Sequence, residues 1–133
     1  LEEHRPDVVR LLDLKIGKSR VSVGIKDGEE LNLNAPELKI ATKMPHISRN
    51  YFAAKATALK IIKLYGSIEL APLVGLADAI VDVVETGTTM KQNGLKVAQT
   101  IMQSSAYLIA NKNSFIIKKD EILSLYEKIK AQI

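Results

Sequence analysis

The sequence has no cysteine, no tryptophan and few aromatic residues of any kind. Without cysteine, a disulfide framework, a thiolate nucleophile and a cysteine-ligated metal site are excluded. No apolar run approaches the roughly 18 residues that span a bilayer, so we expect no membrane segment. The stretch from Leu1 to Asp7 is mostly polar and charged, unlike a signal peptide. The lack of an initiator methionine indicates a processed, truncated or partial chain, and the lack of cysteine fits a cytoplasmic protein.

The charged residues indicate a mild basic excess rather than a nucleic-acid-binding surface. The 133 residues carry a formal net charge of +4, and the lysines are spread along the chain. Nucleic-acid-binding proteins concentrate basic side chains on one face and often add aromatic platforms for bases, so we expect no nucleic-acid partner. A solvated surface is the simplest interpretation, and attraction to nucleotides or pyrophosphates is the alternative. His4 and His46 have no partners at ligand spacing, so we expect no metal site made of protein ligands alone.

Hydrophobic periodicity predicts an α/β fold in which strands alternate with helices. Val21, Val23 and Ile25 alternate with smaller or polar residues, as in a half-buried strand, and the apolar run up to Val84 is typical of a strand buried on both faces. This order favours a mainly parallel sheet with helices on its faces. Strands are expected at 19–25, 38–43, 58–64, 78–84 and 96–110, and helices at 46–56, 67–76, 86–92 and 118–133. The strand-like stretch 96–110 has a polar middle, so it is either a strand pair or one strand that crosses between lobes.

The strongest candidate site follows the apolar strand that ends near Val84. The segment contains two carboxylates, three threonines and one glycine, and a helical turn begins within it: Asp82, Glu85, Thr86, Gly87, Thr88 and Thr89. In open α/β sheets, ligands gather at the carboxyl ends of strands, and the N–H groups at a helix start suit phosphate. The carboxylates could accept from sugar hydroxyls or bind Mg²⁺. An ordinary helix cap is the alternative explanation.

Two weaker candidates follow other predicted strands. Ser67 and Glu69 lie between a strand and a predicted helix, and helix capping is the commoner explanation for such a pair. Lys43 lies at a strand end, where it could pair with a pyrophosphate oxygen, although a surface lysine is the commoner case. No residue is identified as a covalent or acid–base catalyst.

Several segments together resemble the catalytic subunit of the ATP phosphoribosyltransferase family. Residues 11–20 resemble the segment that enters the family's second lobe, and Ile40-Ala41-Thr42-Lys43-Met44-Pro45 resembles its Ala-Thr-Lys-Tyr-Pro stretch. The run from Gly66 to Met90 is the most specific match, and residues 104–111 resemble the returning strand. The resemblance covers almost the whole chain. It fits the C-terminal portion of the short form, without the N-terminal part of the first lobe.

The resemblance implies a two-lobed fold like that of the type II periplasmic binding proteins, here with one complete lobe and the returning part of the other. Residues 18–99 would form the lobe that binds phosphoribosyl pyrophosphate. Residues 1–17 would be a remnant of the first lobe with the crossover, and residues 100–133 its returning strand and C-terminal helix. Position 88 is often Arg or Lys in the family and is Thr88 here, so a phosphate-facing cation is missing from the loop.

The implied activity is transfer of phosphoribosyl from phosphoribosyl pyrophosphate to N1 of ATP with Mg²⁺, the first step of histidine biosynthesis. The implied partners are further copies of the chain and a regulatory subunit that resembles histidyl-tRNA synthetase. One alternative is a non-catalytic solute-binding lobe of the same fold, and another is an inactive fragment of the enzyme. A nucleic-acid-binding module is a further alternative that would show steeply salt-dependent binding.

Overall fold

The computed structural model describes all residues from 1 to 133, and the chain divides into two compact units. The larger unit contains residues 2–4 and 19–103, and the smaller unit contains residues 1, 5–18 and 104–133. None of the helices combines the length and the apolar character that crossing a membrane requires.

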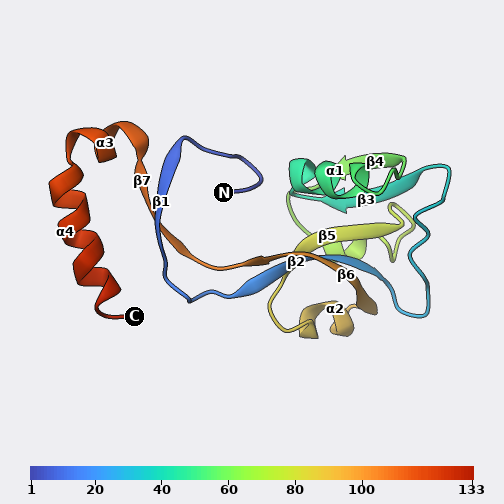
Figure 1. The fold of residues 1–133 in the computed structure, drawn as a ribbon. Coiled ribbons are helices and arrows are strands. Elements are labelled where there is room, and N and C mark those ends of the chain that lie inside the picture. Colours follow the sequence, from blue (N-terminus) through green and yellow to red (C-terminus); the bar gives the residue numbers. More distant parts are fainter. The chain divides into compact units, whose positions relative to one another are not determined.

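The larger unit is built on a five-stranded sheet with strand order β4-β3-β5-β2-β6 (Figure 1). Its strands are β2 (Ser19–Lys26), β3 (Leu38–Thr42), β4 (Leu59–Lys63), β5 (Ala79–Val84) and β6 (Leu95–Ser104). β3 runs parallel to both β4 and β5, whereas β2 is antiparallel to β5. The expected mainly parallel sheet is therefore mixed. Alternation within a strand reports which side chains are buried, but it does not encode the direction of the neighbouring strand.

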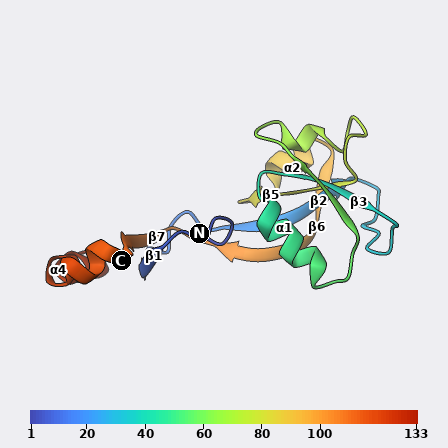
Figure 2. The ribbon, with the colours of Figure 1, turned by 90° about the horizontal axis from the view of Figure 1, so that it is seen from above.

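Both faces of this sheet are covered. Helix α1 (Pro45–Ala53) places Phe52 on one face, against Val23, Ile40 and Val81. Helix α2 (Thr88–Gln92) places Met90 on the other face, in a second cluster with buried residues of β5 and β6. Figure 2 shows α1 and α2 on opposite sides of the strands. β2 is consequently buried on both faces rather than half-buried as expected, because Ser22 and Gly24 face the second cluster.

The prediction of a helix over 67–76 is wrong. The structure has only a short 3₁₀ helix, η1 (Ile68–Leu70), followed by turns. Ser67 adopts a left-handed conformation with φ of 53° and its side chain caps nothing. Pro72 lacks the amide that a continuing helix needs, and Gly75 adopts a φ of +76°. Ile68 and Ala71 still reach the core, whereas Val74 is exposed.

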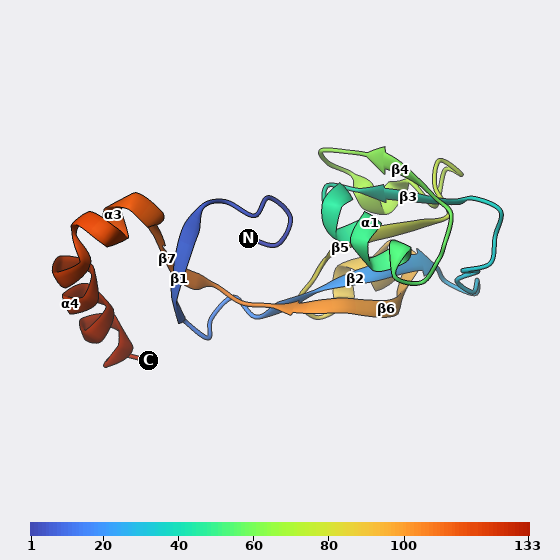
Figure 3. The ribbon, with the colours of Figure 1, turned by 45° about the horizontal axis from the view of Figure 1, so that its top comes forward.

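The smaller unit consists of an antiparallel strand pair and two helices (Figure 3). Its elements are β1 (Val8–Asp13), β7 (Tyr107–Asn111), α3 (Lys112–Ile117) and α4 (Lys119–Lys130). The predicted 118–133 helix corresponds to α4, but β1 and α3 were not expected. The stretch 96–110 contains two strands that do not pair with each other, since β6 neighbours β2 and β7 pairs with β1. The break between them lies at Ser105 and Ala106.

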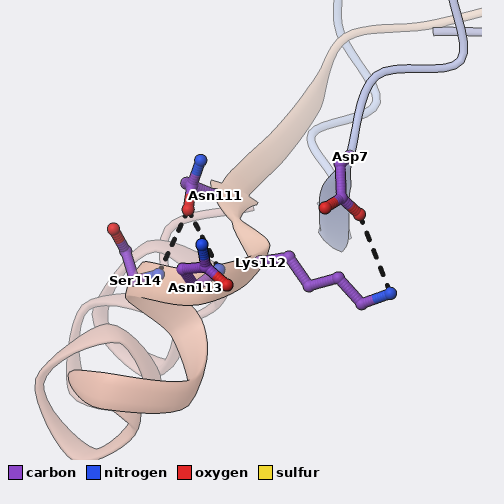
Figure 4. A network of polar contacts seen from close by, with 5 residues as sticks. All are labelled: Asp7, Asn111, Lys112, Asn113 and Ser114. Atoms are coloured by element: carbon purple, nitrogen blue, oxygen red, sulfur yellow. Dashed lines mark hydrogen bonds and ion pairs between the residues drawn. The ribbon is translucent and has the colours of Figure 1, made fainter.

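Polar contacts mark the ends of these elements. The Asn111 side chain accepts hydrogen bonds from the amides of Asn113 and Ser114, so it caps the start of α3 (Figure 4). Lys112 and Asp7 form an exposed ion pair at 3.7 Å, a kind of contact that contributes about 0–1 kcal/mol. Along α4, Ile122, Tyr126 and Ile129 form a half-buried stripe, and the helix has no fully buried residue.

Candidate functional site

The candidate residues gather at one edge of the larger unit's sheet. Because β3, β4 and β5 are parallel, the segments that follow their carboxyl ends emerge at the same edge. β3 is followed directly by Lys43, β4 by the turn that contains Ser67 and Glu69, and β5 by the loop 85–89. All three segments selected from the sequence are therefore neighbours along this edge. The electrostatic influence of Lys43 and Glu69 on Asp82 agrees with this grouping.

The loop 85–89, which we call the threonine loop, is exposed and carries open hydrogen-bond donors. The Thr86 hydroxyl donates to the Thr88 hydroxyl at 2.9 Å and accepts from the Thr88 amide at 3.3 Å, which forms a tight turn. Gly87 has a φ of +84°, a conformation that residues with a Cβ rarely adopt. The amides of Gly87 and Thr89 donate none of the hydrogen bonds in the structure. These two amides and the hydroxyls of Thr88 and Thr89 can donate to a phosphate oxygen, whereas the single proton of the Thr86 hydroxyl is already used within the turn.

Buried side chains hold both ends of the threonine loop. Val84, just before it, is 5% exposed, and Met90, just after it, is also 5% exposed, and both belong to the same apolar cluster. The helix after the loop is followed by Gly94, which adopts a φ of +72°, a conformation common just after a helix end. The Asn93 side-chain amide also donates to the Thr89 carbonyl at 2.8 Å. The loop is thus a fixed exposed turn between two anchored elements.

Asp82 lies three residues before Glu85, the first residue of the loop, and is half-buried. Its Oδ1 atom accepts from the Val83 amide at 2.8 Å. The pKa of the Asp82 carboxyl lies above its ordinary value of 3.8, and burial is the main cause. The Val83 amide and Lys43 act in the opposite direction and lower this pKa, whereas Glu69 raises it. A partly desolvated carboxylate beside a lysine is a strong acceptor for a sugar hydroxyl or a ligand for a cation.

The neighbouring strand end is rigid. Thr42, which ends β3, is fully buried, and its hydroxyl donates to the Val81 carbonyl at 2.8 Å. The same hydroxyl accepts from the Met44 amide at 2.9 Å. These two bonds tie β3 to β5 and direct the chain from Lys43 into α1. Lys43 is exposed at this corner, with its charge available to an anion.

One residue at this edge was not selected from the sequence. Arg20 lies opposite Val84 in the β2–β5 ladder, which places its side chain on the face that carries Asp82. A Cβ atom placed on Gly87 would lie 3.9 Å from the Arg20 Nη2 atom. The buried Arg20 Nε has no hydrogen-bond partner. The available signal was an arginine at the start of an otherwise apolar strand, but only the antiparallel pairing brings that position to the threonine loop.

Comparison with known proteins identifies the family. A profile of ATP phosphoribosyltransferase matches residues 1–131. The chain belongs to the ATP phosphoribosyltransferase family. It is 84% identical over its whole length to an ATP phosphoribosyltransferase of Campylobacter curvus and 78% identical to one of Campylobacter concisus. The chain spans about 65% of the length of these curated relatives.

Solved structures of this family and of binding proteins share the fold. The HisG:HisZ complex of ATP phosphoribosyltransferase from Thermotoga maritima superimposes with a TM-score of 0.88 at 32% identity, covering 97% of this chain and 63% of that one. A truncated arginine-binding protein from the same organism gives a TM-score of 0.64 at 12% identity, covering 99% of this chain and 63% of that one, so the likeness concerns the fold alone. The predicted α/β fold of the type II periplasmic-binding-protein kind is confirmed.

Proposed function

We propose that the carboxyl edge of the sheet binds phosphoribosyl pyrophosphate in an ATP phosphoribosyltransferase. The enzyme would transfer phosphoribosyl to N1 of ATP and release pyrophosphate, the first step of histidine biosynthesis, in the cytoplasm. Membership of the family supports the reaction. The observation that carries the site is the convergence of Lys43, Asp82 and the threonine loop at the ends of two neighbouring parallel strands, β3 and β5.

Each group at this edge has a role that suits a phosphorylated sugar. The free amides of Gly87 and Thr89, with the loop hydroxyls, would bind the 5′-phosphate. Asp82 and Glu85 would accept from the ribose hydroxyls, and Lys43 would attract the pyrophosphate. Ser67 and Glu69, on the adjacent turn, are further candidate contacts. On this assignment, residues 18–99 form the donor-binding lobe, while residues 1–17 and 100–133 belong to the other lobe.

The chemistry is a displacement at the anomeric carbon of ribose. The bond from that carbon to N1 of ATP forms, the bond to the pyrophosphate oxygen breaks, and the electron pair of the broken bond leaves with pyrophosphate. The protein would orient the sugar through its phosphate and hydroxyls, which lowers the entropic part of the barrier. Lys43 would stabilise the negative charge that develops on the leaving group. No residue at this edge is assigned as a nucleophile.

Mg²⁺ fits this edge as an ion that is bound together with the donor. The chain has no cluster of three or more histidine, aspartate or glutamate side chains that could hold a metal by itself. Mg²⁺ typically uses one or two carboxylates together with substrate phosphates, and Asp82 with Glu69 offers such a pair. When bound, the ion would neutralise charge on the pyrophosphate.

The proposed partners follow from the family and from one of its structures. ATP is the second substrate. Because the Thermotoga maritima structure is a complex of HisG with HisZ, we include a separate regulatory subunit that resembles histidyl-tRNA synthetase. Further copies of this chain complete the proposed assembly.

Calorimetry with phosphoribosyl pyrophosphate and Mg²⁺ tests the assignment. Replacing both Thr86 and Thr89 with valine removes the free hydroxyl donor of Thr89 and the Thr86 hydroxyl that shapes the turn, and a hydrogen bond to a charged group contributes about 1.5–3 kcal/mol. Donor affinity should fall at least about tenfold. Thr100→Val, an exposed threonine on β6, is the matched control and should bind like the parent chain. Unchanged affinity in the double variant would remove the threonine loop from the site.

A further inference from the structure

The threonine loop contains no positive charge of its own. Its residues are Glu85, three threonines and Gly87, so the loop contributes only neutral donors and one carboxylate. A phosphate monoester carries about −1.5 to −2 charges at neutral pH, and stable protein sites usually pair such a group with a cation. Some other element at this edge must therefore provide the cation for the 5′-phosphate.

Arg20 occupies the position from which such a charge can act. It is the second residue of β2 and lies directly opposite Val84, the residue that leads into the loop. Opposite residues of an antiparallel pair project to the same face, so Arg20, Val84 and Asp82 share one side of the sheet. The separation of 3.9 Å between Nη2 and a Cβ position on Gly87 puts the guanidinium against the loop backbone. Lys43 lies farther along the edge, at the end of β3.

The guanidinium of Arg20 is not committed to any group of the protein. It takes part in none of the side-chain hydrogen bonds or ion pairs of the structure, and its Nε atom is buried without an acceptor. A buried donor without a partner costs about 1–3 kcal/mol and is uncommon in folded proteins. A phosphate at the Nη groups would give the guanidinium an acceptor, since a guanidinium presents a fork of N–H groups that matches phosphate oxygens.

We propose that Arg20 binds the 5′-phosphate of the sugar donor together with the threonine loop. The proposal rests on the proposed function and adds the charged residue that recognises the phosphate. Binding would engage the free amides of Gly87 and Thr89 from one side and the guanidinium from the other. The direction of β2 matters for this role. Because β2 is antiparallel to β5, its first residues lie at this edge, whereas a parallel strand would bring its carboxyl end, with Lys26, here.

Titration with ribose 5-phosphate tests this role directly. Arg20→Gln should weaken binding by about ten- to hundredfold, and Arg20→Lys should recover part of the loss, because it keeps the charge without the fork. The affinity of Arg20→Gln should also depend less on salt concentration. Lys26→Gln removes one charge from the opposite end of the same strand and should leave binding unchanged. Circular dichroism and thermal melts establish that each variant is folded.

A nuclear magnetic resonance signal separates direct contact from a structural effect. In the ¹⁵N-labelled parent chain, the Arg20 Nε–H resonance should shift on addition of ribose 5-phosphate with the same affinity that calorimetry gives. A stationary resonance, or parent-like affinity in folded Arg20→Gln, would overturn the role of Arg20. If the valine variants of the threonine loop still lose affinity in that case, the proposed function stands. If the parent chain binds neither ribose 5-phosphate nor phosphoribosyl pyrophosphate, the proposed function fails and this inference fails with it.

Discussion

Glu3 provides a sharp test of how the chain fixes helix α1 beside the site. Its carboxylate accepts from the His46 amide at 2.9 Å and from the Ile47 amide at 2.7 Å, across 43 and 44 residues of sequence. Glu3 is only 8% exposed, and the local cap position, Met44, contributes no side-chain hydrogen bond. A distant carboxylate therefore satisfies two of the free amides at the start of the helix and neutralises its positive end.

The magnitude follows from these two bonds. Loss of a single capping side chain costs about 0.5–2 kcal/mol. Glu3→Ala removes two bonds to a charged acceptor, so we expect the upper end, about 2 kcal/mol of the free energy of unfolding. For a domain of this size, that corresponds to a fall in Tm of roughly 8–16 °C. Glu3→Gln keeps one acceptor oxygen and should lose about half as much.

Urea denaturation followed by circular dichroism measures the effect. Glu37→Ala, an exposed glutamate just before β3, is the matched control and should stay within about 0.5 kcal/mol of the parent chain. Equal stability of Glu3→Ala and Glu37→Ala would exclude this capping role for Glu3. A larger loss of stability in Glu3→Gln than in Glu3→Ala would exclude it as well.

Three further predictions concern residues that shape the site. Thr42→Val should lower the free energy of unfolding by about 1–2 kcal/mol, because the Met44 amide loses its acceptor. Equal or higher stability in urea titration would contradict the two hydrogen bonds of the Thr42 hydroxyl. Gly24→Ala should lower the free energy of unfolding by about 1–3 kcal/mol, since the new Cβ would lie 3.0 Å from Cγ1 of the buried Ile80 and 2.9 Å from Met90 Cε. Gly66→Ala meets nothing within 4 Å and should be neutral in a thermal melt. The pKa of the Asp82 carboxyl is raised in the folded chain. The stability that the protonated carboxyl contributes is therefore fully present below pH 3.8 and is lost as the pH rises through the raised value. Asp82→Asn should therefore gain stability relative to the parent chain as the pH rises from 3 to 7. A gain confined to acidic pH would contradict the raised pKa of Asp82.

Local patterns predicted the elements whose signals lie within one segment. The strands around Ile40 and Val81 and the helix after Pro45 follow from short-range periodicity and from the punctuation beside them. The candidate loop after Val84 was also visible, because an apolar strand leads directly into glycine and hydroxyl residues. These signals do not depend on which distant segments pair with the element.

The features that were missed depend on pairing between distant segments. β1 has no clear period of its own and exists as a strand because it pairs with β7, about a hundred residues later. The direction of β2 follows from its pairing with β5, and that pairing brings Arg20 to the loop. The helix expected after Ser67 failed for a local reason, since Pro72 lacks an amide and Gly75 adopts a positive φ, and both interrupt a helix.

The most direct test of the account is an amide chemical-shift titration of the ¹⁵N-labelled chain with phosphoribosyl pyrophosphate and Mg²⁺, with Mg²⁺ alone as the reference. The largest shifts should occur at Gly87 and Thr89, with smaller ones at Asp82 and Lys43. Largest shifts in the loop 27–37, or shifts equal to those from Mg²⁺ alone, would contradict a donor site at the carboxyl edge of the sheet.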